Sequence, residues 1–195
     1  MSVIRAFIAI ELTAEIQNRL DEVITAFKKQ LNGVPVRWVP AGNIHLTLKF
    51  LGDVSMANLK ILTDILITEV AGHRPFEVSV GGAGAFPSNR RPRVIWVGVE
   101  APSELALIQS GIEAAMARLG YPREDRPFSP HLTVGRVSRN ANSDDTHMIS
   151  KVLETSRVGF LGAACVQEIC LFRSDLHPTG AVYTRIYNAP LSQSA

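Results

Sequence analysis

The chain of 195 residues is 46% hydrophobic and 19% charged. These fractions are those of a folded globular protein and exclude a disordered chain or a fibre. The formal net charge is only +2, so the chain carries no overall positive field of the kind that favours nucleic-acid binding. Any anionic ligand must therefore be held by local charge.

The N-terminal run from Val3 to Ile10 is apolar, but it is short and is interrupted by Arg5. We therefore expect neither a signal peptide nor a membrane span. Cys165 and Cys170 are five residues apart in a segment with strand character, so we expect their side chains on opposite faces and not in a disulfide. Two buried free thiols fit a reducing compartment, which favours a cytoplasmic location.

Apolar residues in the first half of the chain recur with the two-residue period of strands and the three- and four-residue spacing of amphipathic helices. Thr13 is a predicted N-cap, and Asn32-Gly33 is a predicted helix end. The expected strands are 3–10, 36–39 and 44–51, and the expected helices are 14–31 and 56–70.

The second half repeats this alternation. Segment 86–93 contains two prolines and is expected to be a loop, as is the proline-rich segment 121–130. Asn142 or Ser143 is expected to cap a short helix that ends at Thr155. The first half ends with an expected strand at 76–80, and the second half is expected to contain the strands 94–99, 131–136, 166–172 and 182–187, with a further helix at 102–119.

Each half contains one His-x-Thr motif, formed by His45 and Thr47 in the first half and by His131 and Thr133 in the second. Residues two apart in a strand share a face, so each motif places an imidazole beside a hydroxyl group while the intervening leucine faces a core. The histidines are 86 residues apart (131 minus 45), close to half the chain. This spacing and the order of elements indicate a duplication, and an α+β fold in which two mainly antiparallel sheets line a central cleft with helices outside.

Two histidines facing one cleft favour general acid-base catalysis, because imidazole titrates near neutral pH. Displacement at phosphorus needs one group to activate the attacking oxygen and another to protonate the departing one. Thr47 and Thr133 could donate hydrogen bonds to the non-bridging oxygens, and Arg136 could neutralise the charge that builds there.

The stretches His45-Leu46-Thr47-Leu48-Lys49-Phe50-Leu51-Gly52 and His131-Leu132-Thr133-Val134-Gly135-Arg136 resemble the paired motifs of the 2H phosphoesterase superfamily. Within it, the chain resembles the RNA 2′,3′-cyclic phosphodiesterase branch, also called 2′-5′ RNA ligases. The similarity takes in the strands Arg5 to Ala9 and Arg37 to Val39, and also Phe128-Ser129-Pro130. It therefore spans nearly the whole chain.

The resemblance implies a bilobal, pseudo-twofold fold: a single domain of residues 1–195 with two intertwined lobes, each carrying one motif. It also implies metal-independent hydrolysis of RNA terminal 2′,3′-cyclic phosphates to 2′-phosphates without a cofactor. The implied partners are RNA 3′ ends with a cyclic phosphate, or small cyclic nucleotides, and we expect a monomer. Carried over by motif position, His45 donates a proton to the leaving 3′ oxygen, His131 activates water, Thr47, Thr133 and Arg136 hold the phosphate, and Phe50 stacks on the terminal base.

Strand alternation alone does not select Phe50 or Arg136 for these roles. Each follows its histidine by five residues, which strict alternation places on the core-facing side. Both lie near a glycine, Gly52 or Gly135, where a bulge could turn the side chain toward the cleft.

The sequence fits other kinds of site less well. A zinc site would need three or four ligands, and neither motif strand carries Asp, Glu or Cys beside its histidine. Segment 81–84 is glycine-rich but lacks the spacing of a dinucleotide loop or a P-loop, so we expect only flexibility before a turn. Two other functions stay open: an RNA-end binding module without chemistry, and 2′-5′ joining of RNA ends as the main activity. A basic rim for RNA is also left open, formed by Arg90, Arg91, Arg93, Arg123 and Arg126.

Overall fold

The computed structural model describes residues 2–178 and 180–192, which form two sheets with antiparallel pairing throughout. Sheet A contains, in spatial order, β3 (Leu46–Ser55), β1 (Val3–Ile10), β8 (Glu168–His177) and β9 (Gly180–Pro190). Sheet B contains β2 (Val36–Trp38), β6 (His131–Val137), β5 (Arg91–Glu100), β4 (Phe76–Ser88) and β7 (Phe160–Val166). The predicted α+β class is confirmed.

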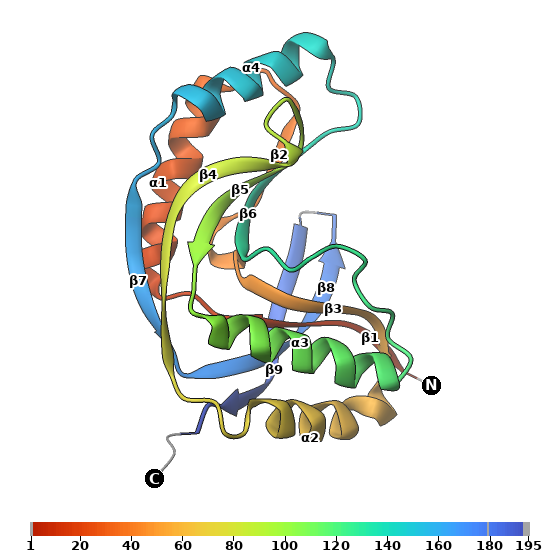
Figure 1. Cartoon of the computed structure of the whole chain (residues 1–195). Coiled ribbons are helices and arrows are strands. Elements are labelled where there is room, and N and C mark those ends of the chain that lie inside the picture. The colour runs from red at the N-terminus through yellow and green to blue at the C-terminus, as the bar shows by residue number, and fades with distance from the viewer. Residues whose placement is uncertain (1, 179, 193–195) are drawn as a thin grey trace.

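The duplication is visible in the order of the strands. In sheet A the motif strand β3 lies beside β1, which lies beside β8, and in sheet B the motif strand β6 lies beside β5, which lies beside β4. Each motif strand therefore pairs with a strand that precedes it in its own half of the chain. Figure 1 shows the two sheets as the arms of a C-shaped molecule with the helices outside.

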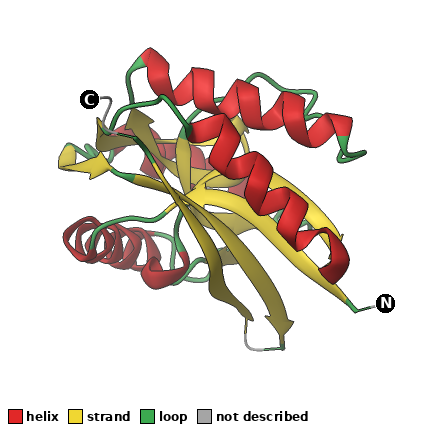
Figure 2. Ribbon diagram, turned by 90° about the horizontal axis from the view of Figure 1, so that it is seen from below, coloured by secondary structure: helices red, strands yellow, loops and turns green. Residues whose placement is uncertain are grey.

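Two helices pack on each sheet. α1 (Ala14–Gln30) and α4 (Ser143–Thr155) pack on sheet B, and α2 (Leu59–Val70) and α3 (Ser103–Arg118) pack on sheet A. α1 follows β1 of sheet A but packs on sheet B, and α3 follows β5 of sheet B but packs on sheet A, so the chain passes from one sheet to the other at both helices. In the view from below, two helices lie in front of the strands (Figure 2). This exchange supports a single domain of intertwined lobes, which stays a prediction.

The main core lies between the helices and the sheets and includes apolar residues from both halves. Leu46 and Leu132, which separate His from Thr in the two motifs, are 1% and 0% exposed. Their burial is what strand alternation predicts for residues on the face opposite the imidazoles. A second, smaller cluster on the other face of sheet A contains Phe7, Ala9, Cys170 and Phe172.

Two helix starts agree with the capping predictions. The backbone N–H of Ile16 donates to the Thr13 hydroxyl group at 3.4 Å. Asn142 forms a reciprocal capping box with Asp145, each side chain accepting from the other's backbone N–H at 2.9 Å.

The segment 86–93 is not a loop, because β4 and β5 continue through it as a hairpin. Pro87 and Pro92 lie opposite each other in this hairpin. The neighbouring strands stop before it: β7 pairs with β4 only as far as Gly81, and β6 pairs with β5 only as far as Val94. No outer strand therefore needs the N–H groups that the prolines lack, which is how prolines are accommodated in sheets.

The cysteine prediction is partly wrong. Cys165 is exposed in β7, a strand that the sequence reading missed, and Cys170 is buried in β8. Both thiols are free, as expected. Burial raises the pKa of the Cys170 thiol to about 12, with a smaller contribution from the Glu168 carboxylate, so this thiol stays protonated near neutral pH. Among the described residues, no helix combines the length and apolarity required to cross a membrane.

Candidate active site

The two motif strands belong to different sheets, yet they approach each other. Cα atoms of β3 and β6 come within 8 Å of one another. His45 is the residue before β3, and His131 is the first residue of β6, so both histidines stand at the beginning of a motif strand. The fold thereby brings together two motifs that are far apart in the sequence.

Both imidazoles are held by the same kind of hydrogen bond. Nδ1 of His45 lies 3.1 Å from the carbonyl oxygen of Asn43, and Nδ1 of His131 lies 2.7 Å from the carbonyl oxygen of Ser129. A carbonyl oxygen only accepts, so Nδ1 must carry the proton in each ring. In the neutral tautomer Nε2 is then left with a free lone pair, which is the atom that can take or deliver a proton.

His45 stands against aromatic side chains of sheet A. Its ring centroid lies 4.6 Å from that of Phe172, 5.6 Å from that of Tyr183 and 6.0 Å from that of Phe7, all in edge-on arrangements. This burial lowers the pKa of His45, and the Asn43 carbonyl and the charge of Glu11 only partly oppose the shift. In the free protein His45 is therefore mainly neutral at pH 7.

His131 has fewer aromatic neighbours than His45. The ring of Phe86 meets it edge-on at a centroid distance of 4.8 Å. Like His45, His131 is half-buried, so both rings reach the surface. In the first motif, Asn43 fixes the 3₁₀ turn before His45, because its side-chain amide donates to the carbonyl oxygen of Ala181 at 2.8 Å.

A β-bulge follows the threonine in each motif. In β3, Thr47 pairs with Ala9 and Lys49 pairs with Ile8, which leaves Leu48 as an extra residue. In β6, Thr133 pairs with Trp96 and Gly135 pairs with Ile95, which leaves Val134 as an extra residue at the equivalent place. The duplication has therefore preserved an irregularity of the strand as well as its sequence.

The bulges decide where Phe50 and Arg136 point. One extra residue reverses the alternation of the side chains beyond it, so Phe50 rejoins the face of Thr47, and Arg136 rejoins the face of Thr133. Phe50 is 65% exposed and lies 6.1 Å, between ring centroids, from Phe7 of the His45 surroundings. Strict alternation was wrong at both positions. A bulge was considered as an exception, but beside Gly52 and Gly135, whereas the bulges that turn these side chains lie at Leu48 and Val134.

A second arginine lies beside Arg136. Arg37 of β2 is its direct partner across the strand pair, and both side chains are exposed. Like charges in directly opposed positions destabilise a sheet, and neither guanidinium lies within ion-pair distance of a carboxylate in the part of the chain that the structure describes. The pair supplies the local positive charge that the low net charge requires for an anionic ligand.

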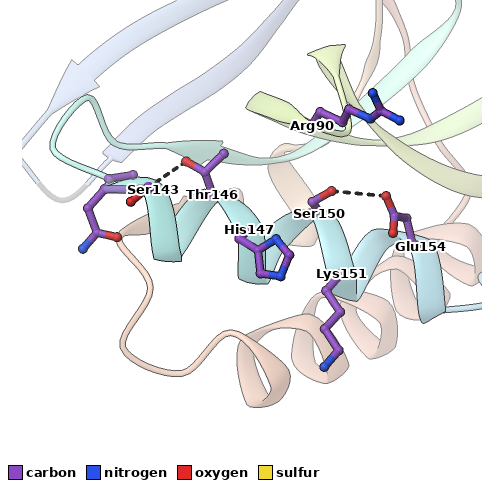
Figure 3. Close-up of a pocket in the computed structure, with 9 residues that line it drawn as sticks. Arg90, Ser143, Thr146, His147, Ser150, Lys151 and Glu154 are labelled. Carbon is purple, nitrogen blue, oxygen red and sulfur yellow. Dashed lines mark hydrogen bonds between the residues drawn. The ribbon is translucent and has the colours of Figure 1, made fainter.

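A pocket of about 750 Å³ lies elsewhere, between α4 and the tip of the β4–β5 hairpin (Figure 3). Its lining includes Arg90, His147 and Lys151 but none of the six predicted site residues. In Figure 3, Arg90 extends from the hairpin on one side of α4 and Lys151 points to the other side, so their charges do not converge. The predicted basic rim therefore gains no support from this pocket and stays a prediction.

The glycine-rich segment 81–84 is strand, not a flexible approach to a turn. A Cβ on Gly84 would lie 2.5 Å from the Trp96 ring, so only glycine leaves room for this ring beside β4. Trp96 is also the strand partner of Thr133, so Gly84 makes room for an aromatic ring beside the second motif. Within residues 2–178 and 180–192, no three His, Cys, Asp or Glu side chains are grouped as metal ligands would be.

Sequence reasoning missed the groups that surround the histidines, namely Phe7, Phe172, Tyr183 and Phe86. A signal for two of them was present, because Phe7 and Phe172 alternate with the core residues Ile8 and Leu171 and so had to face away from the core. The carbonyl groups that orient the imidazoles carry no sequence signal.

Sequence comparison places this geometry in a family. The sequence model of the LigT-like phosphoesterases matches the chain twice, at residues 10–96 and at residues 97–183. The chain belongs to the LigT-like phosphoesterase family. Each match contains one His-x-Thr motif of this phosphoesterase, so the duplication seen in the sheets is also a duplication of the family's unit.

Curated relatives and solved structures agree with the family. An RNA 2′,3′-cyclic phosphodiesterase of Methanothermobacter thermautotrophicus is 35% identical over 181 residues, which cover 93% of this chain and 95% of the relative. One of Thermotoga maritima is 31% identical and covers 94% of this chain and 93% of its own. The crystal structure of E. coli LigT complexed with 3′-AMP superposes with a TM-score of 0.79 at 29% identity, over 98% of this phosphoesterase and 100% of that chain.

The lowered pKa of His45 predicts a titration in the free phosphoesterase. In an NMR titration of the ring protons, the midpoint for His45 should lie below 6.5, because burial disfavours the imidazolium. The unfolded chain binds the His45 proton more tightly than the folded chain does. The free energy of unfolding should therefore decrease as the pH falls from 6.5 through the folded pKa. A His45→Gln variant assigns the resonance, and a midpoint at or above 6.5 would contradict the prediction.

Proposed function

We propose that this phosphoesterase hydrolyses terminal 2′,3′-cyclic phosphates of RNA to 2′-phosphates with its two histidines. The observation that carries the proposal is the matched pair of motifs, each with an oriented imidazole, a threonine two residues on and a bulge after it. The curated relatives are named RNA 2′,3′-cyclic phosphodiesterases, which supports this substrate class.

In the proposed reaction, Nε2 of His131 takes a proton from a water molecule whose oxygen attacks phosphorus. The bond between phosphorus and the 3′ oxygen breaks, and protonated Nε2 of His45 gives its proton to that oxygen. The product is a 2′-phosphate with a free 3′-hydroxyl group, and the two imidazoles end in exchanged protonation states. Proton exchange with solvent restores them, so two groups of opposite protonation suffice for one turnover.

The acid role of His45 requires a bound anion. Its pKa is lowered in the free protein, which works against protonation. A phosphate diester beside the ring carries a negative charge, and an opposite charge within about 4 to 6 Å favours the imidazolium. The substrate would thus help to create the acid that cleaves it.

The remaining site residues act on the ligand. Thr47 and Thr133 donate hydrogen bonds to the non-bridging oxygens, and Arg136 neutralises their charge. Phe50, exposed and on the face of Thr47, stacks on the terminal base. These groups hold the phosphate and supply both proton transfers, so the proposed mechanism needs neither a metal ion nor a cofactor. We further propose that the protein acts as a monomer in the cytoplasm.

Two alternatives keep the same residues. A binding module would hold the cyclic end without converting it, and an RNA-joining enzyme would use a 5′-hydroxyl group in place of water. The free Nε2 on both rings favours proton transfer over mere binding, because the identical Nδ1 contacts leave that atom available twice.

The deciding experiment uses a dinucleotide ending in a 2′,3′-cyclic phosphate, in buffer with a chelator. We expect a 2′-phosphate as product, identified by chromatography against 2′- and 3′-phosphate standards. Binding without product would support the module, and loss of turnover in the chelator would overturn the metal-free mechanism. Adding an RNA with a 5′-hydroxyl end separates joining from hydrolysis.

A further inference from the structure

A lysine is buried within the first motif strand. Lys49 is 4% exposed, and it is one of three buried polar or charged residues among those described. Lysine is almost never fully buried unless its charge is paired. At the bulge in β3, two consecutive residues, Leu48 and Lys49, both turn to the core side.

The ammonium group of Lys49 joins two other parts of the chain. It donates to Oε2 of Glu113 on α3 at 2.9 Å, where the Glu113 side chain is 14% exposed, and it donates to the carbonyl oxygen of Pro122. Oε2 of Glu113 also accepts from the backbone N–H of Glu124 at 3.4 Å. Both Pro122 and Glu124 belong to the irregular segment 121–130 that ends just before His131.

α3 holds the bulge itself at a second point. The side-chain amide of Gln109, one turn before Glu113 on α3, donates to the carbonyl oxygen of Leu48 at 3.4 Å. Leu48 is the extra residue that lacks a partner on β1, and a buried carbonyl oxygen needs a hydrogen-bond donor. Gln109 is buried as well, so the contact is shielded from water.

The second motif has no such cluster. Its residue equivalent to Lys49 is Gly135, where a Cβ would lie 2.9 Å from Val36 and 3.1 Å from the Trp38 ring. The second bulge is therefore supported by close packing against β2, while the first lies on an edge strand whose sole sheet neighbour is β1. An edge strand needs support from outside the sheet if its bulge is to keep one register.

We propose that Lys49, Gln109 and Glu113 form a positioning cluster that fixes the first bulge and the segment leading to His131 relative to each other. The cluster rests on the proposed function, since it sets the relation between the two histidines and the direction of Phe50. It touches no substrate and acts through the residues that do. A buried ion pair contributes little net stability but can specify one geometry, and this is the use assigned to it here.

The test replaces the pair together, as Lys49→Met with Glu113→Gln, so that no buried charge is left alone. We expect kcat on the cyclic-phosphate dinucleotide to fall about 10- to 100-fold, because small displacements of reacting groups are costly. Amide hydrogen exchange should accelerate in residues 121–130 and around Leu48. The exposed pair on α2, changed as Lys60→Met with Asp64→Asn, is the matched control and should change neither readout.

A purely structural role is separated by a stability-matched variant. Leu66→Ala on α2 removes a fully buried side chain outside the cluster, so it should lower the melting temperature while kcat well below that temperature stays unchanged. If the paired variant loses the same stability but keeps kcat and the exchange rates of 121–130, the proposal is wrong.

A further variant covers the case in which the paired variant does not fold. Gln109→Met removes only the donor to Leu48, and we expect a higher KM with less effect on kcat, since Phe50 follows that bulge. An unchanged KM and unchanged exchange at Leu48 would overturn the proposal. If the unaltered protein shows no turnover, the proposed function fails, while the exchange measurements still decide on the cluster.

Discussion

Replacing His131 with alanine is expected to lower kcat on a 2′,3′-cyclic phosphate by about 10²- to 10⁴-fold, the range typical of a lost general acid or base. His45→Ala should cost a similar factor. In the proposed mechanism the two imidazoles act in one step, so the double variant should be little worse than either single variant. Rates with a cyclic-phosphate dinucleotide under saturating substrate measure this directly.

The control for these variants is His177→Ala, because His177 is exposed at the end of β8. It should leave kcat unchanged. His45 also packs among aromatic rings, so its variants need a thermal unfolding curve to show that they are folded at the assay temperature. A folded His45 or His131 variant with near-normal kcat would remove the two-histidine mechanism.

Thr133→Val is expected to lower kcat by about 10²-fold with a smaller change in KM. In the proposed mechanism this change removes one hydrogen-bond donor to an oxygen whose charge grows in the transition state. Valine has nearly the same shape, and Thr133 is half-buried, so the fold should persist. Thr47→Val should behave alike if the two motifs hold the phosphate symmetrically. Steady-state kinetics give kcat and KM separately.

Thr63→Val on α2 is the matched control, since its hydroxyl group donates only to the Lys60 carbonyl of the same helix. A rise in KM alone at position 133, with kcat preserved, would mean that the hydroxyl group contributes to ground-state binding and not to the transition state.

The sequence was sufficient for the periodic features of the fold. Two-residue alternation placed Thr47 and Thr133 on the faces of their histidines and the intervening leucines in the core, and helical spacing located all four long helices. These predictions succeed because a regular backbone maps sequence position directly onto direction in space.

The features that were missed are those in which the backbone departs from regularity or depends on remote segments. Phe50 and Arg136 needed bulges whose existence depends on register with β1 and β5. β7 carries small residues that give little strand signal, and it exists because β4 offers it an edge. The partners of Lys49 lie on a helix and a segment more than 60 residues away in sequence, where local patterns have no reach.

The equivalent bulges bear on how a site built from two similar motifs can bind a ligand whose two ends differ. Three residues after its threonine, the first motif strand carries an aromatic ring, Phe50, and the second carries a guanidinium group, Arg136. Both imidazoles stand at the start of a motif strand and bind a backbone carbonyl group through Nδ1, so this shared geometry alone would not distinguish two orientations of a ligand. The ring and the cation differ in what they attract, so under the proposed function they would favour one orientation of the ligand over the other. Any preference for one ligand orientation would thus come from side chains three residues beyond each threonine, and not from the groups proposed to move protons.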